Sequence, residues 1–165
     1  MLPCLLPDPA LIVFDKVTID ETNSVIRCQA FVTQQTAVCP RCQASTSRIH
    51  SKYQRKLADL PWAGKPVQIW LQVRRFFCQN VACRRKIFNE RLPTVAAPWA
   101  RRTKRLAETQ QVIGLMAGGS DGSRLCTALG MNASIDLLLD LVWDTLCKYV
   151  KVSPRIMRPL GAAGH

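Results

Sequence analysis

Hydrophobic and polar residues alternate in the first half of the chain, a pattern typical of half-buried β-strands. The clearest case is the run VQIWLQV, whose apolar residues fall on one face: Val67, Ile69, Leu71 and Val73. The preceding LPWAGKP is rich in turn-forming residues, and a partner strand is expected at 49–57. Near the N-terminus, FDKVTID and VIRCQAFV flank the polar ETNS and predict a β-hairpin.

Helical spacing replaces this alternation in the second half. The run ERLPTVAAPW is interpreted as a linker or capping turn, and a helix is expected from Ala100 to Gly118–Gly119. Its apolar face would comprise Leu106, Val112, Ile113 and Met116. A short second helix would stop at Gly130, and Ser134 is a suitable N-cap for a third helix, IDLLLDLVWDTLCKYV. This order is typical of a helix-turn-helix, although any pair of antiparallel helices has a similar pattern.

Four of the eight cysteines form two close pairs, in CPRC and in CQNVAC. A short gap lets both sulfurs of a pair face one point, and two such pairs supply the S4 set that structural zinc sites favour. The intervening residues must form their own structure, and a β-hairpin there is the zinc-ribbon arrangement. We therefore predict a Zn²⁺ ion bound by Cys39, Cys42, Cys78 and Cys83.

Other interpretations of these cysteines stay open: a redox pair, an iron site of the same geometry, or ordinary buried cysteines. His50 is interpreted as a surface or phosphate-contacting residue rather than a ligand. The remaining cysteines have no partner at ligand spacing and are expected in the core or in loops. They are Cys4, Cys28, Cys126 and Cys147.

Together these patterns predict an α+β chain. We expect an N-terminal β-hairpin at 1–35, a zinc-ribbon domain at 36–93, a helix-turn-helix segment at 94–150 and an irregular tail at 151–165. The sequence shows no secretory signal and no apolar run of about 18 residues. We therefore expect a cytoplasmic protein, in a compartment where cysteines are more often ligands than disulfides.

The basic residues are concentrated in the middle of the chain. The net charge is +12, and residues 39–105 hold sixteen of the 23 basic but only two of the 11 acidic side chains. Such a block indicates a polyanionic partner, with a solubilising surface as the alternative. The candidate phosphate contacts are Arg48, His50, Lys52, Arg55, Lys56, Arg74, Arg75, Arg84, Arg85, Lys86, Arg101, Arg102, Lys104 and Arg105. The interspersed aromatic residues are expected in the core rather than as a base-stacking platform: Tyr53, Trp62, Trp70, Phe76, Phe77 and Phe88.

The run from CPRC to ERLP resembles the zinc-binding domain of the ISL-three family of bacterial insertion-sequence transposases. The matching segments are the two cysteine pairs, HSKYQRKLADLPW, VRRFFC, IF and ERLP, in that order. WARRTKRLAE and GSRLCTALGMNASIDLLL resemble the segments that follow, the second being the family's helix-turn-helix. The resemblance covers about residues 10–140. It implies a zinc-stabilised region, associated with the bacterial nucleoid, that recognises terminal inverted repeats in double-stranded DNA and positions them for a DDE catalytic domain.

The chain departs from that family in several ways. The catalytic domain is missing, so we expect a fragment without enzymatic activity. Asp136, Asp140 and Asp144 share one helical stripe, whereas a two-metal site needs carboxylates from different elements. The same aspartates make the third helix acidic, which disfavours DNA reading. Gln43 stands where a glycine is common, which predicts a strained knuckle.

The run from WDTLCKYV to the C-terminus does not resemble the family, and a truncation or frameshift in a parent gene would explain it. Three functional hypotheses follow: a DNA-binding transposase fragment, an active transposase, or an interaction remnant. The sequence speaks against the second. The third would self-associate or inhibit an intact transposase, because the last helix is apolar over most of its circumference.

Overall fold

A computed structural model describes residues 5–150, and for residues 148–150 it describes the backbone only. The chain divides into two compact units, Met1–Leu106 and Ala107–His165, which are considered separately below. The expected irregular tail at 151–165 and Cys4 lie outside the described residues. Within the described range, no helix combines the length and the apolar character that crossing a lipid bilayer requires.

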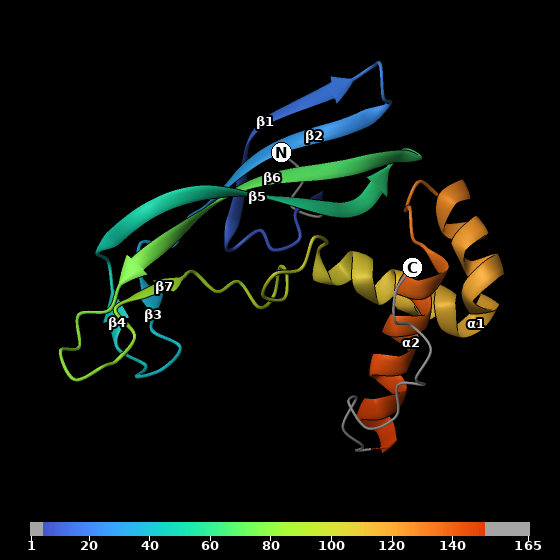
Figure 1. Cartoon of the computed structure of the whole chain (residues 1–165). Coiled ribbons are helices and arrows are strands. Elements are labelled where there is room, and N and C mark those ends of the chain that lie inside the picture. The colour runs from blue at the N-terminus through green and yellow to red at the C-terminus, as the bar shows by residue number, and fades with distance from the viewer. Residues whose placement is uncertain (1–4, 151–165) are drawn as a thin grey trace, which may run out of the picture. The chain divides into compact units, whose positions relative to one another are not determined.

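A five-stranded sheet forms the body of the first unit (Figure 1). Its order is β1-β2-β6-β5, and β7 pairs with the end of β6 on the edge that faces β2, past the last β2–β6 pair. All pairings are antiparallel except that of β2 with β6. The strands are β1 Ile12–Asp20, β2 Val25–Val32, β5 Ile49–Trp62, β6 Lys65–Phe77 and β7 Ile87–Asn89, and a separate two-stranded sheet consists of β3 Ala37–Val38 and β4 Ser45–Thr46.

The alternating pattern produces the core of this unit. In β6 the apolar residues that were expected on one face are each at most 2% exposed, which confirms that prediction: Val67, Ile69, Leu71 and Val73. Strand β2 alternates in the same way. The run ERLPTVAAPW, expected to be a linker or a capping turn, contributes Leu92, Val95 and Ala96 to the same core. These three side chains are buried because they cover the apolar face of the sheet, which must pack against another layer.

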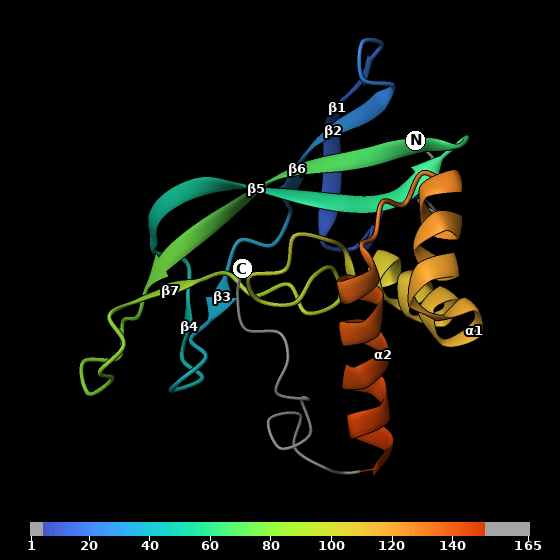
Figure 2. The ribbon, with the colours of Figure 1, turned by 45° about the vertical axis from the view of Figure 1, so that its right-hand side comes forward.

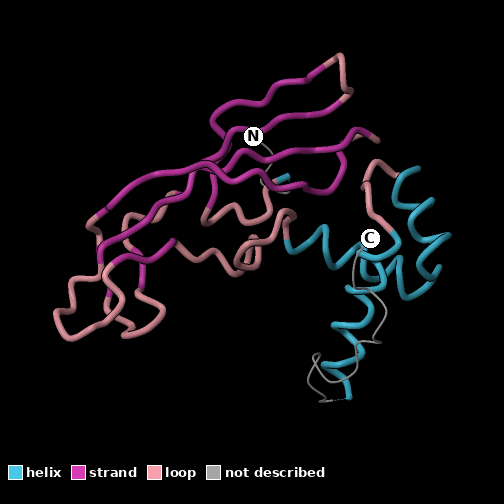
Figure 3. The backbone as a smooth tube through the Cα atoms, in the orientation of Figure 1, coloured by secondary structure: helices cyan, strands magenta, loops and turns pink. Residues whose placement is uncertain are grey.

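The two longest strands form a hairpin with a two-residue turn. Ala63 and Gly64 connect β5 to β6 with φ values of 48° and 74°, the left-handed pair that a tight hairpin turn of type I′ requires. The expected strand at 49–57 is therefore confirmed, and it continues to Trp62, where it pairs with Lys65. The hairpin thereby runs the full length of the sheet (Figure 3).

The parallel pairing of β2 with β6 joins the N-terminal hairpin to the region of the cysteine pairs. Ile26 lies opposite Val67, and the register continues to Phe31 opposite Gln72. The hairpin at 1–35 and most of 36–93 therefore share one sheet. The four-part division of the chain stays a prediction.

Two helical elements follow: α1 Lys104–Ala128 and α2 Ile135–Val150. Helix α1 starts later than expected, because Arg101 and Thr103 are hydrogen-bonded to the backbone of Ala58. The Thr103 hydroxyl then caps the helix, accepting the N–H of Leu106 at 3.3 Å. Gly118 (φ 73°, ψ −170°) interrupts α1, which confirms the predicted break between two helices.

The second unit is packed closely along its glycines. A Cβ at Gly114 would lie 3.0 Å from Val142, one at Gly119 would lie 2.9 Å from Ile135, and one at Gly122 would lie 3.0 Å from Leu138. Glycine at these positions lets the two halves of α1 approach α2 closely. The Ser134 hydroxyl accepts the N–H of Leu137 at 3.2 Å, so the predicted N-cap is confirmed. The helix-turn-helix geometry stays a prediction.

Candidate metal centre and its basic surroundings

The two loops that carry the cysteine pairs, between β3 and β4 and between β6 and β7, lie at the same end of the β5–β6 hairpin (Figures 1 and 2). Cys39 and Cys42 lie in the turn between β3 and β4, and that small sheet leads directly into β5. Cys78 follows the last residue of β6, and Cys83 lies in the loop before β7. Because β5 and β6 are antiparallel, the start of one strand and the end of the other bring the two pairs together.

The four sulfurs form one compact group. Their Sγ atoms all lie within 4.8 Å of one another, and those of Cys42 and Cys78 are 3.5 Å apart. A tetrahedral ion with bonds of ~2.3 Å would separate its sulfur ligands by about 3.8 Å, which lies within this range. The donor set, four thiols with no carboxylate, is the one that closed structural zinc sites use. The residues therefore fit Zn²⁺.

Backbone hydrogen bonds shape each knuckle. In the first, the Gln43 N–H donates to the Cys39 carbonyl at 2.9 Å, and Gln43 takes φ 59° to do so. Gln43 therefore has the left-handed backbone that was predicted from its place, where a glycine is common. In the second, the Cys83 N–H donates to the Asn80 carbonyl at 3.1 Å, and the Cys78 N–H donates to the Lys86 carbonyl at 2.8 Å.

The thiols of the cluster do not ionise alike. Burial raises the pKa of Cys39, but N–H groups of Cys42 and Arg41 and the neighbouring thiols outweigh it and bring the pKa to about 6. Burial raises the pKa of Cys78 to about 12, helped by its neighbouring thiols and opposed by the Asn80 N–H. A first thiolate therefore forms readily, while a second in the same group needs a cation to compensate it.

The described cysteines outside the cluster are all buried. Burial, with a contribution from Asp59, raises the pKa of Cys28 to about 11, and burial also raises the pKa of Cys126. Cys147 is also buried. Cys28 and Cys126 are therefore neutral thiols, and the burial of all three is as expected for cysteines that are not metal ligands.

A small apolar cluster supports the knuckles. Phe76 and Phe88 are almost fully buried and stack with ring centroids 6.0 Å apart, against Cys39 and Cys83. The expectation that these phenylalanines belong to the core is confirmed. Phe77 is only half-buried and is contacted by the His50 ring at 4.8 Å and by the Arg48 guanidinium at 4.9 Å.

Several predicted phosphate contacts are exposed near the metal site. Arg84, Arg85 and Lys86 lie in the chain between Cys83 and β7. The Lys86 ammonium donates to the carbonyl of Val81 at 3.1 Å, which ties this basic segment to the knuckle loop. The other exposed basic candidates of β5 and β6, with Arg48 just before β5, are Arg48, His50, Lys52, Lys56 and Arg75.

The prediction that Arg74 contacts phosphate must be corrected. Arg74 is 8% exposed, and it pairs with the buried carboxylate of Glu90 at 2.5 Å and donates to the Gln34 carbonyl. Its guanidinium is therefore used inside the protein and is not available to phosphate. No local pattern predicts this pairing, because Arg74 and Glu90 come together only through the pairing of β6 with β7.

Arg105 is also committed to an internal network. Its guanidinium pairs with Asp59, which is 2% exposed, and donates to the carbonyls of Leu5 and Leu6. The Thr103 hydroxyl donates to the same carboxylate at 2.6 Å. Arg105 therefore anchors the N-terminal segment. Of its predicted neighbours, Arg101 and Lys104 are exposed and Arg102 is half-buried.

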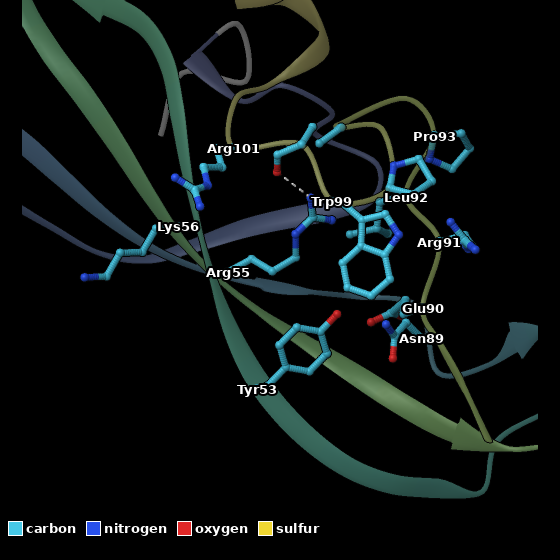
Figure 4. Close-up of a pocket in the computed structure, with 13 residues that line it drawn as sticks. Tyr53, Arg55, Lys56, Asn89, Glu90, Arg91, Leu92, Pro93, Trp99 and Arg101 are labelled. Atoms are coloured by element: carbon cyan, nitrogen blue, oxygen red, sulfur yellow. Dashed lines mark hydrogen bonds between the residues drawn. The ribbon is translucent and has the colours of Figure 1, made fainter. Parts of the chain in front are cut away.

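A cavity of about 270 Å³ lies beside the sheet, and no cysteine lines it (Figure 4). We call it the Trp99 pocket. Its wall includes the predicted candidates Arg55 and Arg101, together with Arg91, which sequence reasoning did not select. The lining residues are Tyr53, Arg55, Lys56, Asn89, Glu90, Arg91, Leu92, Pro93, Ala96, Pro98, Trp99, Ala100 and Arg101.

The acidic stripe on α2 does not form a metal site. Asp136, Asp140 and Asp144 are all exposed on that one helix. Among residues 5–150, the four cysteines are the one group of three or more potential ligands that could share an ion. The arrangement within this range supports structural zinc and offers no cluster of catalytic carboxylates.

Comparison with known proteins supports the zinc assignment. Residues 35–83 match the model of a protein family described as the zinc-finger of transposase IS204/IS1001/IS1096/IS1165. No curated protein matches the chain, and no solved structure does. The match spans all four clustered cysteines, so Zn²⁺ as the cofactor of this region is confirmed.

Proposed function

We propose that this chain is a zinc-stabilised DNA-binding fragment of an ISL-three type transposase, and that it binds the terminal inverted repeats of its element. The observation that carries the proposal is the four-cysteine group at the end of the β5–β6 hairpin, surrounded by exposed cations, in a region that matches a transposase zinc-finger. The chain would supply recognition, and a catalytic domain outside it would cut the DNA.

The metal has a structural role in this proposal. The knuckle end buries only two aromatic side chains besides the cysteines themselves, Phe76 and Phe88. So little apolar surface does not hold two loops in one conformation. Zn²⁺ would fix the loops, and with them the basic segment between Cys83 and β7.

The exposed cations would bind the DNA backbone. Arg84, Arg85 and Lys86 extend from one knuckle, and Arg48 and Lys52 lie at the adjoining end of β5. Contacts from such side chains to phosphate supply affinity and orientation but carry no sequence information. With roughly six of them, affinity would fall about a thousandfold between 50 and 200 mM salt.

Sequence reading would come from the open face of the sheet rather than from α2. Gln54 and Gln72 lie directly opposite each other in the β5–β6 register, and both are exposed, as is Gln68. A glutamine side chain can donate to and accept from adenine, which makes it suited to base recognition. Helix α2 instead presents exposed aspartates, such as Asp136 and Asp144, which repel phosphate.

The test is salt-dependent binding by the zinc-loaded chain. Fluorescence anisotropy with a duplex carrying the inverted repeat of the neighbouring element, and with a scrambled duplex, gives affinity and specificity. Replacing Arg84, Arg85 and Lys86 by Ala should weaken both complexes alike. It should also reduce the slope of log K against log salt by about 0.9 for each lost phosphate contact.

Arg124→Ala is the matched control, because Arg124 is exposed in the second unit and forms an exposed ion pair with Asp121. It should leave both affinities unchanged. Binding of the wild-type chain that is insensitive to salt would overturn the electrostatic surface. Equal affinity for the repeat and the scrambled duplex would overturn the recognition of inverted repeats.

Self-association is a second candidate function, favoured by the apolar surface of the second unit. Met116 is 85% exposed, and Val112 and Leu139 are each more than half exposed. Apolar side chains exposed to this degree can contribute to a protein interface. Light scattering across a concentration series should then show dimers or larger species, or a complex with an intact transposase. A chain that stays monomeric both alone and in the presence of an intact transposase contradicts this candidate function.

A further inference from the structure

The Trp99 pocket combines features that the zinc site and the knuckle cations do not explain. It is formed by three segments: part of β5, the stretch from Asn89 to Pro93, and the stretch from Ala96 to Arg101. Its volume of about 270 Å³ is close to the lower end of the range for small-molecule sites, ~300 Å³. All three segments belong to the first unit. The cavity can therefore be described without reference to the helices.

Trp99 is the most unusual residue of its wall. Its side chain is 85% exposed, and its backbone has φ 65°. A bulky residue in the left-handed region is a genuine outlier, and such strain is found most often at ligand sites. An exposed indole stabilises the free protein little, so neither folding nor packing accounts for a tryptophan there.

The charge of the pocket is positive. Arg55 donates from its Nη2 atom to the carbonyls of Ala97 at 3.2 Å and Ala100 at 2.7 Å, which fixes its guanidinium in the wall. Arg101 and Arg91 are exposed at the rim. The one acidic lining residue, Glu90, is already paired with Arg74.

The aromatic and cationic groups converge. Figure 4 shows the Tyr53 hydroxyl pointing toward the Trp99 indole. The Arg55 guanidinium lies beside that indole, and Arg101 lies on the other side of Arg55. Lys56 points away, because its ammonium lies over the Trp70 ring at 4.2 Å. The pocket therefore offers a flat apolar surface next to the fixed guanidinium of Arg55 and the exposed one of Arg101.

We propose that the Trp99 pocket binds one nucleotide of unpaired DNA. Its base would stack on the indole of Trp99, and its phosphate would lie between Arg101 and Arg55. A stacked duplex does not present an isolated base, so the pocket would favour single-stranded or frayed ends over continuous duplex. This inference rests on the proposed function in one respect, because it takes DNA as the ligand.

The experiment compares two probes with the zinc-loaded chain. One is a fluorescent blunt-ended duplex, and the other is the same duplex with a short single-stranded overhang. The wild-type chain should bind the overhang probe more tightly, and Trp99→Ala should lose about tenfold on that probe alone. Ile19→Ala is the control, since Ile19 is also exposed, at 56%, lies in the same unit and does not line the pocket.

Trp99→Gly separates loss of stacking from loss of fold. Glycine adopts φ 65° without strain, so this variant should keep its zinc and its thermal stability while losing the preference for the overhang. Equal binding of both probes by the wild-type chain would overturn the pocket proposal, and so would equal losses on both probes in the Trp99 variants. If the blunt duplex does not bind at any salt concentration, the proposed recognition of duplex DNA is contradicted. The pocket proposal is tested independently, by the effect of the Trp99 variants on binding of the overhang probe.

Discussion

The two ends of the β5–β6 hairpin are stabilised in different ways. Toward its turn, β6 lies at the centre of a cluster of fourteen buried residues, which includes Leu71. At the other end the buried cluster has four members, of which Cys39 and Cys83 are metal ligands and Phe76 and Phe88 are the others. One part of the hairpin can rely on apolar burial, and the other needs an ion. A single pair of strands thus combines two sources of stability, and substitutions should separate them.

Removing a zinc ligand should have the largest effect. Zinc in isolated zinc-finger peptides contributes an apparent ~10–16 kcal/mol, which becomes folding free energy when the site forms only on folding. We expect Cys83→Ser to lose stoichiometric zinc. We also expect it to lose hydrogen-exchange protection in the knuckles, while residues 67–73 stay protected.

Cys126→Ala is the control for that change, because Cys126 is a buried thiol of the second unit and is not a ligand. It should keep a full equivalent of zinc in a metal assay. If Cys83→Ser also removes protection from residues 67–73, the two ends unfold as one cooperative unit, and the comparison fails.

Breaking the Arg74–Glu90 pair comes next. Both side chains are buried at the junction between the two ends, with side-chain exposures of 10% and 3%. Arg74→Met leaves the Glu90 carboxylate buried without its cation, which typically costs about 3–5 kcal/mol. Urea denaturation measures this loss. Arg75→Met, at an exposed neighbour, should change stability by less than about 0.5 kcal/mol.

A double variant tests the cause. Arg74→Met combined with Glu90→Leu removes both charges, and it should recover much of the lost free energy, because no isolated charge remains buried. A double variant as unstable as Arg74→Met alone would show that packing of the arginine side chain, and not its charge, is what the junction requires.

Truncating a side chain of the sheet core should have a smaller effect, and it should act on the part of the hairpin toward the turn. Leu71 is fully buried, and Leu71→Ala should cost about 3 kcal/mol through lost burial and the cavity that remains. The melting temperature should fall while zinc stoichiometry stays at one. Loss of zinc in this variant would show that the knuckles depend on the core for their geometry.

The smallest effect concerns backbone strain at the first knuckle. Gln43 has φ 59°, where a residue with a Cβ is disfavoured. Gln43→Gly should stabilise the zinc-bound form by about 0.5 kcal/mol, and Gln43→Val should destabilise it by a larger amount. Competition with a zinc chelator measures both. A weaker site in Gln43→Gly would indicate that the glutamine side chain makes a contribution of its own.

Local patterns in the sequence predicted much of this structure. The alternation around Leu71, the break at Gly118 and the cap at Ser134 each depend on residues within a few positions of one another. The cysteine pairs were recognisable for the same reason, since each pair carries its own ligand spacing.

What the sequence did not reveal depends on residues that only the sheet brings together. The parallel pairing of β2 with β6 leaves no local signal, because the partners are separated by the whole of β3, β4 and β5. The same is true of Arg74, whose carboxylate partner Glu90 comes directly after β7, beyond a loop. The Trp99 pocket combines residues of β5 with residues 89–101, which lie far along the chain from β5, so the sequence did not distinguish its cations from the other basic residues.

The position of the cysteines also bears on how the chain avoids misalignment. A slip of one residue between β5 and β6 would turn the apolar residues outward, and burial would oppose it. A slip of two residues keeps every side chain on its proper face, so burial distinguishes it poorly. It would, however, move the knuckles apart by about 7 Å, farther than four sulfurs within 4.8 Å of one another allow. Zinc is therefore a check on strand alignment, accepting the native register and rejecting its nearest plausible error.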